Sequence, residues 1–221
     1  MRGCRLIEMR SAWELEPLAP PREGQPRRER GKDLSSMAVA AGERMALGEP
    51  PEADEHGRTP LYNACLNGHV DAARSLLAQG ADVNRVNKYG TTPLYAACES
   101  GRVDAVRLLL DNGAEVDRAM EGSWTPLLTA CDKDVDMVRL LLDKGAEVDQ
   151  AEADGMTPLL VACSCGNVDA ARLLLEKGAE VDRAEADGMT PLYMACEEGH
   201  VEAARLLLDN GAKVDQADED G

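Results

Sequence analysis

The sequence contains no phenylalanine, and its only aromatic side chains are two tryptophans and four tyrosines. Large aromatic residues dominate ordinary cores, so this core must be built mainly from Leu, Val, Ala and Met. Long apolar runs are also missing, and no stretch approaches the ~18 residues that a membrane-spanning helix needs. The opening MRGCRLIEMR carries charges without a following apolar segment. We therefore expect no secretory leader and an intracellular location, the cytoplasm or alternatively the nucleus.

Basic residues are scarce in one part of the chain. The net charge is −17; residues 1–50 carry nine Lys/Arg and eight Asp/Glu, whereas residues 51–221 carry 15 and 33. A surface this acidic repels nucleic-acid phosphates and anionic lipid head groups. We therefore expect neither nucleic acid nor a membrane as a partner. The charge serves solubility on the simpler interpretation, and an acidic docking face for a basic partner is the alternative.

Patterns that support catalysis or metal binding are missing as well. The chain has three histidines, and no Ser, Cys or Lys stands at a catalytic spacing from one of them. No glycine-rich loop suited to phosphate is present. Cys163 and Cys165 lie two residues apart without a second pair, and the closing DEDG lacks the other ligands of a calcium loop. We therefore expect no enzyme activity, no cofactor and no metal.

The sequence instead repeats itself at a fixed interval. Thr-Pro-Leu occurs five times, at spacings of 33, 33, 32 and 33, and each copy is followed by Leu-Leu and then Gly-Ala. Five cysteines follow the same spacings, which places one in each unit rather than in facing pairs, so we expect small buried apolar residues and no disulfides. They are Cys65, Cys98, Cys131, Cys163 and Cys196. Self-similarity at this period predicts a stacked repeat array.

Each unit predicts two short helices. Thr92 is a suitable N-cap, and Pro93 loses nothing at the first helical position. Gly101 ends this helix, residues 103–112 predict a second one, and Gly113 ends that. A polar loop with an Asp-Gly turn signal leads to the next Thr-Pro. One helix pair buries little surface, so the units must stack on one another to be stable.

The shared pattern DG-x-TPL-x-x-AC-x-x-GHV-x-AARLLL-x-x-GA-x-VD closely resembles the ankyrin repeat, from Ala53 to Asp220. The resemblance implies an all-α solenoid of stacked helix–turn–helix units with projecting turns or hairpins. We expect repeats at about 53–85, 86–118, 119–150, 151–183 and 184–216, and the start of a sixth at 217–221. Residues 1–34, rich in Pro, Arg and Glu, predict a disordered tail. Residues 35–52 predict a degenerate capping helix and linker.

Two departures from the family pattern stand out. The family usually has His after Thr-Pro-Leu, where this chain has Tyr62, Tyr95, Leu128, Leu160 and Tyr193. The hydrogen bond of that His must therefore be made differently or lost. The third unit lacks the glycine between its helices, because only three residues separate Cys131 from Val135. We expect a non-glycine residue to make this turn at a cost of about 1 kcal/mol, with a local irregularity.

The resemblance implies a non-enzymatic scaffold that binds another protein through its concave face, the surface formed by the loop tips and the first helices. The loop-tip positions before Thr-Pro are expected to align, with Tyr89 nearby, as Arg58, Thr91, Trp124, Met156 and Met189. Trp124 and the two methionines would then form an apolar strip, unless they pack against their own turns. The family's variable positions on the first helices are Leu66, Asn67, Glu99, Ser100, Asp132, Lys133, Ser164, Cys165, Glu197 and Glu198.

Two further hypotheses concern the C-terminal unit. Without a sixth unit, the apolar helix surface of the fifth would stay uncovered, so we expect this end to associate with another molecule. Alternatively, the chain is the recognition arm of a larger multidomain protein, such as an enzyme or a ubiquitin-ligase adaptor. The partner's identity is not written in the sequence, since a repeat fold serves many unrelated partners.

Overall fold

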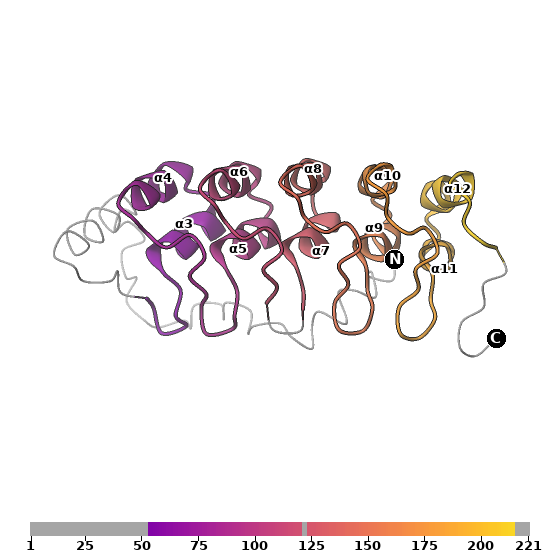
Figure 1. Cartoon of the computed structure of the whole chain (residues 1–221), viewed down its shortest axis with the longest axis horizontal. Helices are drawn as coiled ribbons and strands as arrows, with labels where there is room; N and C mark the ends of the chain where they lie inside the picture. The colour runs from indigo at the N-terminus through magenta and orange to yellow at the C-terminus, as the bar shows by residue number, and fades with distance from the viewer. Residues whose placement is uncertain (1–52, 121–122, 215–221) are drawn as a thin grey trace, which may run out of the picture.

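The computed structural model describes residues 53–120 and 123–214. This part of the chain forms ten helices in five successive pairs, which stack side by side along one axis (Figure 1). The first helices of the pairs are α3 (Pro60–Asn67), α5 (Pro93–Glu99), α7 (Pro126–Cys131), α9 (Pro158–Ser164) and α11 (Pro191–Glu197). The second helices are α4 (Val70–Ala78), α6 (Val103–Asp111), α8 (Val135–Asp143), α10 (Val168–Glu176) and α12 (Val201–Asp209).

The two helices of each pair lie in separate layers. In Figure 1 the second helices form the upper row, the first helices form the row below, and the connecting loops project downward. The described residues contain no strand. The predicted all-α solenoid of helix–turn–helix units is therefore confirmed. The predicted tail, capping helix and sixth-unit start fall on residues 1–52 and 215–221, outside the described part.

The Thr-Pro pairs start the first helices as the sequence predicts. Each threonine has extended backbone, and its hydroxyl accepts a hydrogen bond from the backbone N–H three residues on, as at Thr92, where the distance to the nitrogen of Tyr95 is 3.1 Å. The proline follows at the first helical position, where no partner for its missing N–H is needed. All five caps of this kind are buried, so they fix the level at which every unit enters its first helix.

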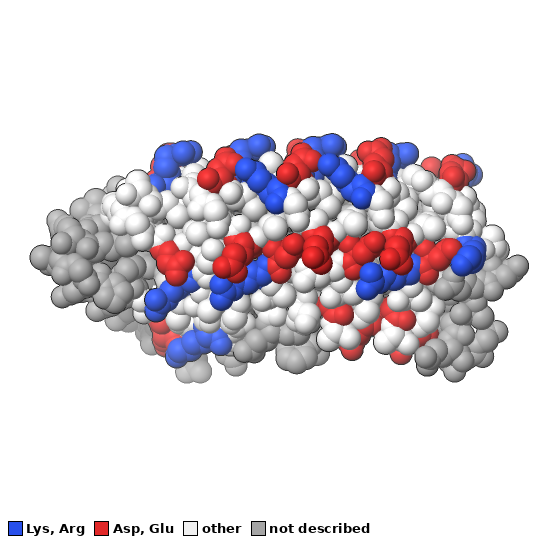
Figure 2. Space-filling model, in the orientation of Figure 1, with Lys and Arg blue, Asp and Glu red and all other residues white. Residues whose placement is uncertain are grey.

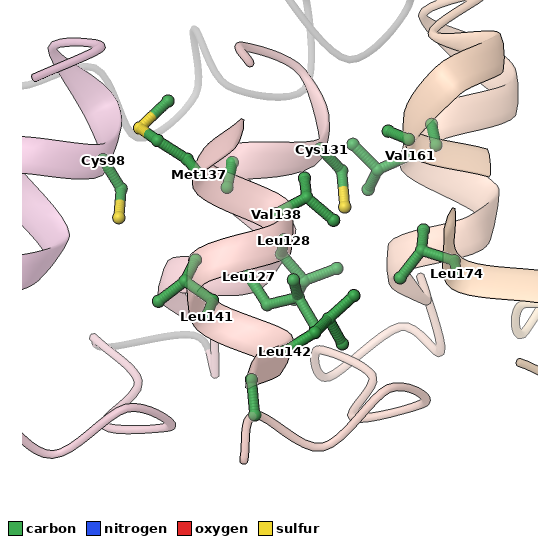
Figure 3. Packing of buried hydrophobic residues seen from close by; sticks show 14 of the residues in the cluster. Cys98, Leu127, Leu128, Cys131, Met137, Val138, Leu141, Leu142, Val161 and Leu174 are labelled. Carbon is green, nitrogen blue, oxygen red and sulfur yellow. The ribbon is translucent and has the colours of Figure 1, made fainter. Parts of the chain in front are cut away.

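A continuous apolar layer joins the two rows of helices. Leucine, alanine, valine and cysteine fill it, and each described unit adds its own leucines to the same cluster. Cys131 of α7 lies between Val138 of α8 and Val161 of α9 (Figure 3). Burial raises the pKa of the Cys163 thiol to about 12. These observations confirm that four of the five periodic cysteines are free, buried apolar residues.

Cys196 departs from that prediction because its side chain is exposed. The equivalent cysteines of the earlier units have no exposed surface, since each lies under the next unit in the stack. Helix α11 packs against α9 on one side, and no described helix packs on its other side. The exposure of Cys196 therefore reflects its place in the last described unit.

Polar contacts connect consecutive units along the loops that follow the second helices. The carboxylates of Asp117, Asp149 and Asp182 accept hydrogen bonds from backbone N–H groups of the next unit, at Glu147, Glu180 and Lys213. Partial burial raises the pKa of Asp117 and of Asp149. Each unit thus ends in an acceptor that the following unit satisfies.

Further contacts between units come from the second helices. Lys144 Nζ lies 2.9 Å from Asp111 Oδ1, and Lys177 Nζ lies 2.9 Å from Asp143 Oδ1. Each lysine follows the second helix of its own unit and reaches back to the aspartate that ends the second helix of the unit before. The two ion pairs therefore repeat one contact at successive interfaces.

The third unit makes its turn without glycine and with a local irregularity, as expected, but no residue of the turn has a positive φ. Helix α7 ends at Cys131, one residue earlier than its neighbours in the pattern, and Asp132 keeps helical backbone angles (φ −83°, ψ −16°). Asp134 then adopts extended backbone and caps α8 by accepting the N–H of Asp136 at 2.7 Å. A left-handed residue is unnecessary because the shorter helix and a true aspartate cap make the turn.

Backbone strain in the third unit lies instead at Ser123, which has a φ of 64°. Among the described residues it is the only non-glycine with a positive φ. The equivalent positions of the other loops are glycines, for example Gly155 with a φ of 87°. The irregularity of the third unit therefore extends to its loop tip.

Candidate protein-binding surface

The loop tips are held by one recurring side-chain contact. At the start of each of three tips, a side-chain oxygen accepts backbone N–H groups two and four residues further on: Asp54, Asn87 and Glu152 act in this way at distances of 2.8 to 3.3 Å. Such local bonds fix a turn that no regular secondary structure stabilises. The tips are therefore ordered platforms on which exposed side chains keep defined positions.

Neighbouring tips also contact one another. The backbone N–H of Lys88 donates to the carbonyl oxygen of His56 at 3.0 Å, and that of Ala186 donates to Asp154 at 2.8 Å. The rings of His56 and Tyr89 stack with their centroids 6.4 Å apart. Tyr89, predicted to lie on the concave face, is thus half-buried between the first two tips.

The predicted row before Thr-Pro is not an exposed strip, and this corrects the sequence analysis. Thr91 and Met156 are each only 2% exposed. Trp124 and Met189 are partly buried and pack against the hydrophobic core. Arg58 is also partly buried and pairs with Asp54 at 3.6 Å. Met156 belongs to the buried hydrophobic cluster, so it cannot form part of an exposed apolar strip.

The first helices present a more open row. Asn67, Glu99, Lys133 and Glu197 are exposed. Five others are half-buried: Leu66, Ser100, Asp132, Cys165 and Glu198. Ser164 is fully buried and cannot meet a partner, which removes one predicted residue. His200 Nε2 of the next unit lies 3.0 Å from the Ser164 backbone carbonyl oxygen.

The charges on this face divide along the array. The tips and first helices of the first three units carry both signs of charge, with Arg58, Lys88 and Lys133 beside Asp54, Glu55, Glu99 and Asp132; Arg58 pairs with Asp54 and Lys133 with Asp132. Those of the last two units carry no Lys or Arg, and their acidic residues are Glu152, Asp154, Glu185, Asp187, Glu197 and Glu198. Figure 2 shows basic side chains over the first loops and only acidic ones over the tips of the last two.

Sequence reasoning missed several of these charged residues. Lys88, Asp154 and Asp187 stand at loop tips and are exposed, yet only the position directly before Thr-Pro was expected to face outward. The Asp-Gly turn signal marks two of them in the sequence, because the residue before the turn glycine lies at the outermost point. Glu152, by contrast, is half-buried and holds its own turn.

The described residues contain no group of three His, Cys, Asp or Glu side chains that could hold a metal ion. No helix among them is long and apolar enough to cross a membrane. The side chains of the concave face can therefore contribute charge, hydrogen bonds and limited apolar contact to a partner.

Comparison with known proteins agrees with this architecture. The family model described as "Ankyrin repeats (3 copies)" matches residues 37–120, 86–152 and 128–218. The chain belongs to the ankyrin-repeat family. Ankyrin repeat domain-containing protein 13B of mouse and of human are each 54% identical to the chain over 37 residues. That stretch is 17% of this chain and only 6% of either relative.

Membership in the family gives the general role of the array. Ankyrin repeats mediate protein–protein interaction and are typically non-catalytic. The tyrosine found in place of the family's histidine makes its own contact in the first unit, where the Tyr62 hydroxyl lies 3.2 Å from the Thr91 hydroxyl of the second. In the first unit, the expected change in hydrogen bonding therefore takes the form of a bond between two units.

Proposed function

We propose that this ankyrin array is a non-enzymatic scaffold that binds a partner protein through the concave face, and that the partner places a basic segment over the fourth and fifth units. The observation that supports this is that the tips and first helices of these two units carry acidic residues and no Lys or Arg. Asp154, Asp187 and Glu197 are exposed on the tips and first helices of these units, whose sequences contain no Lys or Arg. A basic segment laid across them gains attraction from several carboxylates at once.

The charges on the first three units influence which way round that partner would bind. Lys88 is exposed on the same face, and Lys133 pairs with Asp132 at 2.7 Å, so these units attract a basic segment less than the all-acidic tips of the last two units do. Between the two halves, the partly buried Trp124 presents the largest apolar side chain of this face. A partner segment with an acidic or neutral end, an apolar residue in the middle and a basic end would match these features in one direction only.

The proposed site of action is intracellular, in the cytoplasm or alternatively in the nucleus. The buried thiols of the described units are free rather than paired, as is usual in reducing compartments. Nucleic acid is a poor partner because of the acidic array. The recognition arm of a larger protein, the alternative predicted from the sequence, would use the same face.

Charge reversal on matched surfaces tests the proposal. In one variant Asp187 and Glu197 of the concave face become lysine; in the control Glu176 and Glu202, exposed on the second helices, become lysine. Proteins captured from cell extract by the natural chain are quantified by mass spectrometry against both variants. We expect the concave variant to lose the specific partners at least ~10-fold and the control to keep them. Equal retention by both variants would contradict the proposal.

A further inference from the structure

The turn between the two helices of the first unit is covered by a side chain of the second unit. Arg102, the residue directly before α6, reaches back over Gly68, where a Cβ would lie 2.9 Å from Arg102 Cδ. Arg102 Nε donates a hydrogen bond to the carbonyl oxygen of Leu66 at 3.4 Å. One side chain thus fills the space over the turn and satisfies a carbonyl group at the end of α3, where helical partners are lacking.

The same contact recurs further along the array. Asn167, directly before α10, donates from Nδ2 to the carbonyl oxygen of Cys131 at 3.0 Å. His200, directly before α12, places its ring over Gly166 and its Nε2 3.0 Å from the carbonyl oxygen of Ser164. Each acceptor lies at the end of the first helix of the unit before. A guanidinium, an amide and an imidazole therefore fill one recurring position of the repeat.

The junction between the second and third units lacks this contact. Asp134 holds the equivalent position, directly before α8, but an ionised carboxylate has no proton to donate, and it accepts the N–H of Asp136 in its own unit. Among the described residues, no side chain donates to the carbonyl oxygen of Glu99, the counterpart of Leu66. A Cβ on Gly101 would meet no atom within 4 Å apart from its neighbours in the chain. We call residues 99–101 the uncovered turn.

The groups at this junction are mainly acceptors of negative charge. The Glu99 side chain is exposed at the end of α5, where the carbonyl groups also carry the negative end of the helix dipole. Asp134 adds a second carboxylate from the third unit. The nearest cations in sequence are already engaged, since Arg102 contacts the first unit and Lys133 pairs with Asp132 at 2.7 Å. The uncovered turn therefore suits a cationic donor from another molecule.

We propose that the uncovered turn, together with Asp134 across the junction, binds one arginine side chain of a partner protein. Arg102 shows the geometry within this chain: its aliphatic stem covers the glycine and its guanidinium donates to the carbonyl group at the helix end. In the second unit Glu99 adds a carboxylate, which strengthens a hydrogen bond to a guanidinium. Lysine suits the site less well because it lacks the planar fork of donors. This site is separate from the acidic tips of the fourth and fifth units, and its test does not depend on theirs.

A short peptide that carries a single arginine is the probe. The full chain, labelled with ¹⁵N, is titrated with acetyl-Gly-Arg-Gly-amide, and its backbone amide signals are followed by NMR. We expect saturable shifts centred on Gly101, with a Kd of about 1 mM because one side chain offers few contacts. Peptides with lysine, or with citrulline, which has a similar shape without the charge, should bind at least ~5-fold more weakly.

Two substitutions fill the site from within the chain. Asp134→Arg supplies the side chain that Arg102 provides at the first junction. Asp134→Asn supplies the amide donor found at Asn167 and keeps an oxygen that can cap α8. Both changes should weaken binding of the arginine peptide at Gly101 at least ~5-fold. The control Glu176→Arg makes the same change of charge at an exposed position of α10 and should leave binding at Gly101 unchanged.

Three results would overturn the proposal. One is the absence of saturable shifts at Gly101, or shifts spread evenly over the acidic loops, because the peptide would then only screen the net charge. Another is equal binding of the arginine and citrulline peptides. The third is unchanged binding at Gly101 in the Asp134 variants. Dispersed amide signals show that each variant is folded, and Asp134→Asn decides the matter if Asp134→Arg does not fold.

Discussion

The hydroxyl oxygens of Tyr62 and Thr91 lie 3.2 Å apart and join the first unit of the array to the second. Both residues are almost fully buried, at 4% and 2% exposure. Burial raises the pKa of Tyr62, while the hydrogen bond from Thr91 opposes this shift. The pair is a buried side-chain contact between two repeats.

Removing the tyrosine hydroxyl should therefore weaken the first interface. Tyr62→Phe leaves Thr91 with a buried hydroxyl that has lost this partner, and we expect a loss of about 1 kcal/mol in the free energy of unfolding. Tyr193→Phe is the matched control, because Tyr193 is 42% exposed and its change should cost almost nothing. Urea denaturation followed by circular dichroism measures both. Equal costs for the two variants would show that the hydrogen bond contributes nothing.

Ser123 offers a stabilising substitution. Its φ of 64° is unfavourable for a residue with a side chain, so Ser123→Gly should raise the free energy of unfolding by up to about 1 kcal/mol. The converse change, Gly155→Ser, should be destabilising by more, because a Cβ there would lie 3.1 Å from Glu185 Cα and 3.2 Å from Ala186 N. Thermal denaturation of both variants checks the pair. A lower melting temperature for Ser123→Gly would show that the serine side chain is needed at this tip.

The helices and the repeat stack could be predicted from sequence because their causes are local and recur. The Thr-Pro start at Thr92 and the glycine end at Gly113 each require only neighbouring residues, and five copies of one pattern leave little ambiguity. The buried state of Cys163 followed from its period alone. Reasoning from neighbouring residues was less successful in the third unit. There helix α7 is one residue shorter, and Asp132 keeps helical backbone angles.

The binding face was harder to predict because exposure depends on the neighbouring unit. Met156 and Trp124 occupy equivalent positions, yet Met156 is buried to 2% exposure and Trp124 remains partly accessible. Met156 lies in the buried hydrophobic cluster and Trp124 packs against it, and that cluster is formed by several units together. Lys88 and Asp187 were overlooked because they stand earlier in their loops than the position directly before Thr-Pro, which was expected to face the partner.

The buried cysteines predict that the array loses stability in alkali. Burial raises the pKa of Cys65 and of Cys163 from 9.0 to about 12, so the folded state holds thiol protons that the unfolded chain releases. Their contribution to the free energy of unfolding is fully present below pH 9. It is lost as the pH rises towards 12, at about 1.4 kcal/mol per pH unit for each thiol. Urea midpoints at pH 8, 9 and 10 measure the slope. Cys163→Ala should have a shallower slope, whereas Cys196→Ala, at an exposed position, should not.

A substitution at Asp149 can separate the effect of its charge on stability from the effect of its hydrogen bond. Its carboxylate accepts the Glu180 N–H at 3.2 Å, but burial raises its pKa, so the charged form is held at some cost to the fold. Asn84 occupies the equivalent place after the first unit and accepts the Glu115 N–H at 2.9 Å as a neutral amide. Asp149→Asn should therefore keep the contact and equal or exceed the natural chain in stability at pH 7.

Asp149→Ala removes the acceptor and should cost about 1 kcal/mol, because the Glu180 N–H loses its partner between two units. The raised pKa also fixes a pH dependence. The folded state retains the Asp149 proton to a higher pH than the unfolded chain, so this group favours folding more as the pH falls through its folded pKa. Asp149→Asn should remove that increment, which urea denaturation between pH 4 and pH 7 measures. If the asparagine variant is as unstable as the alanine variant at pH 7, the negative charge itself stabilises the junction.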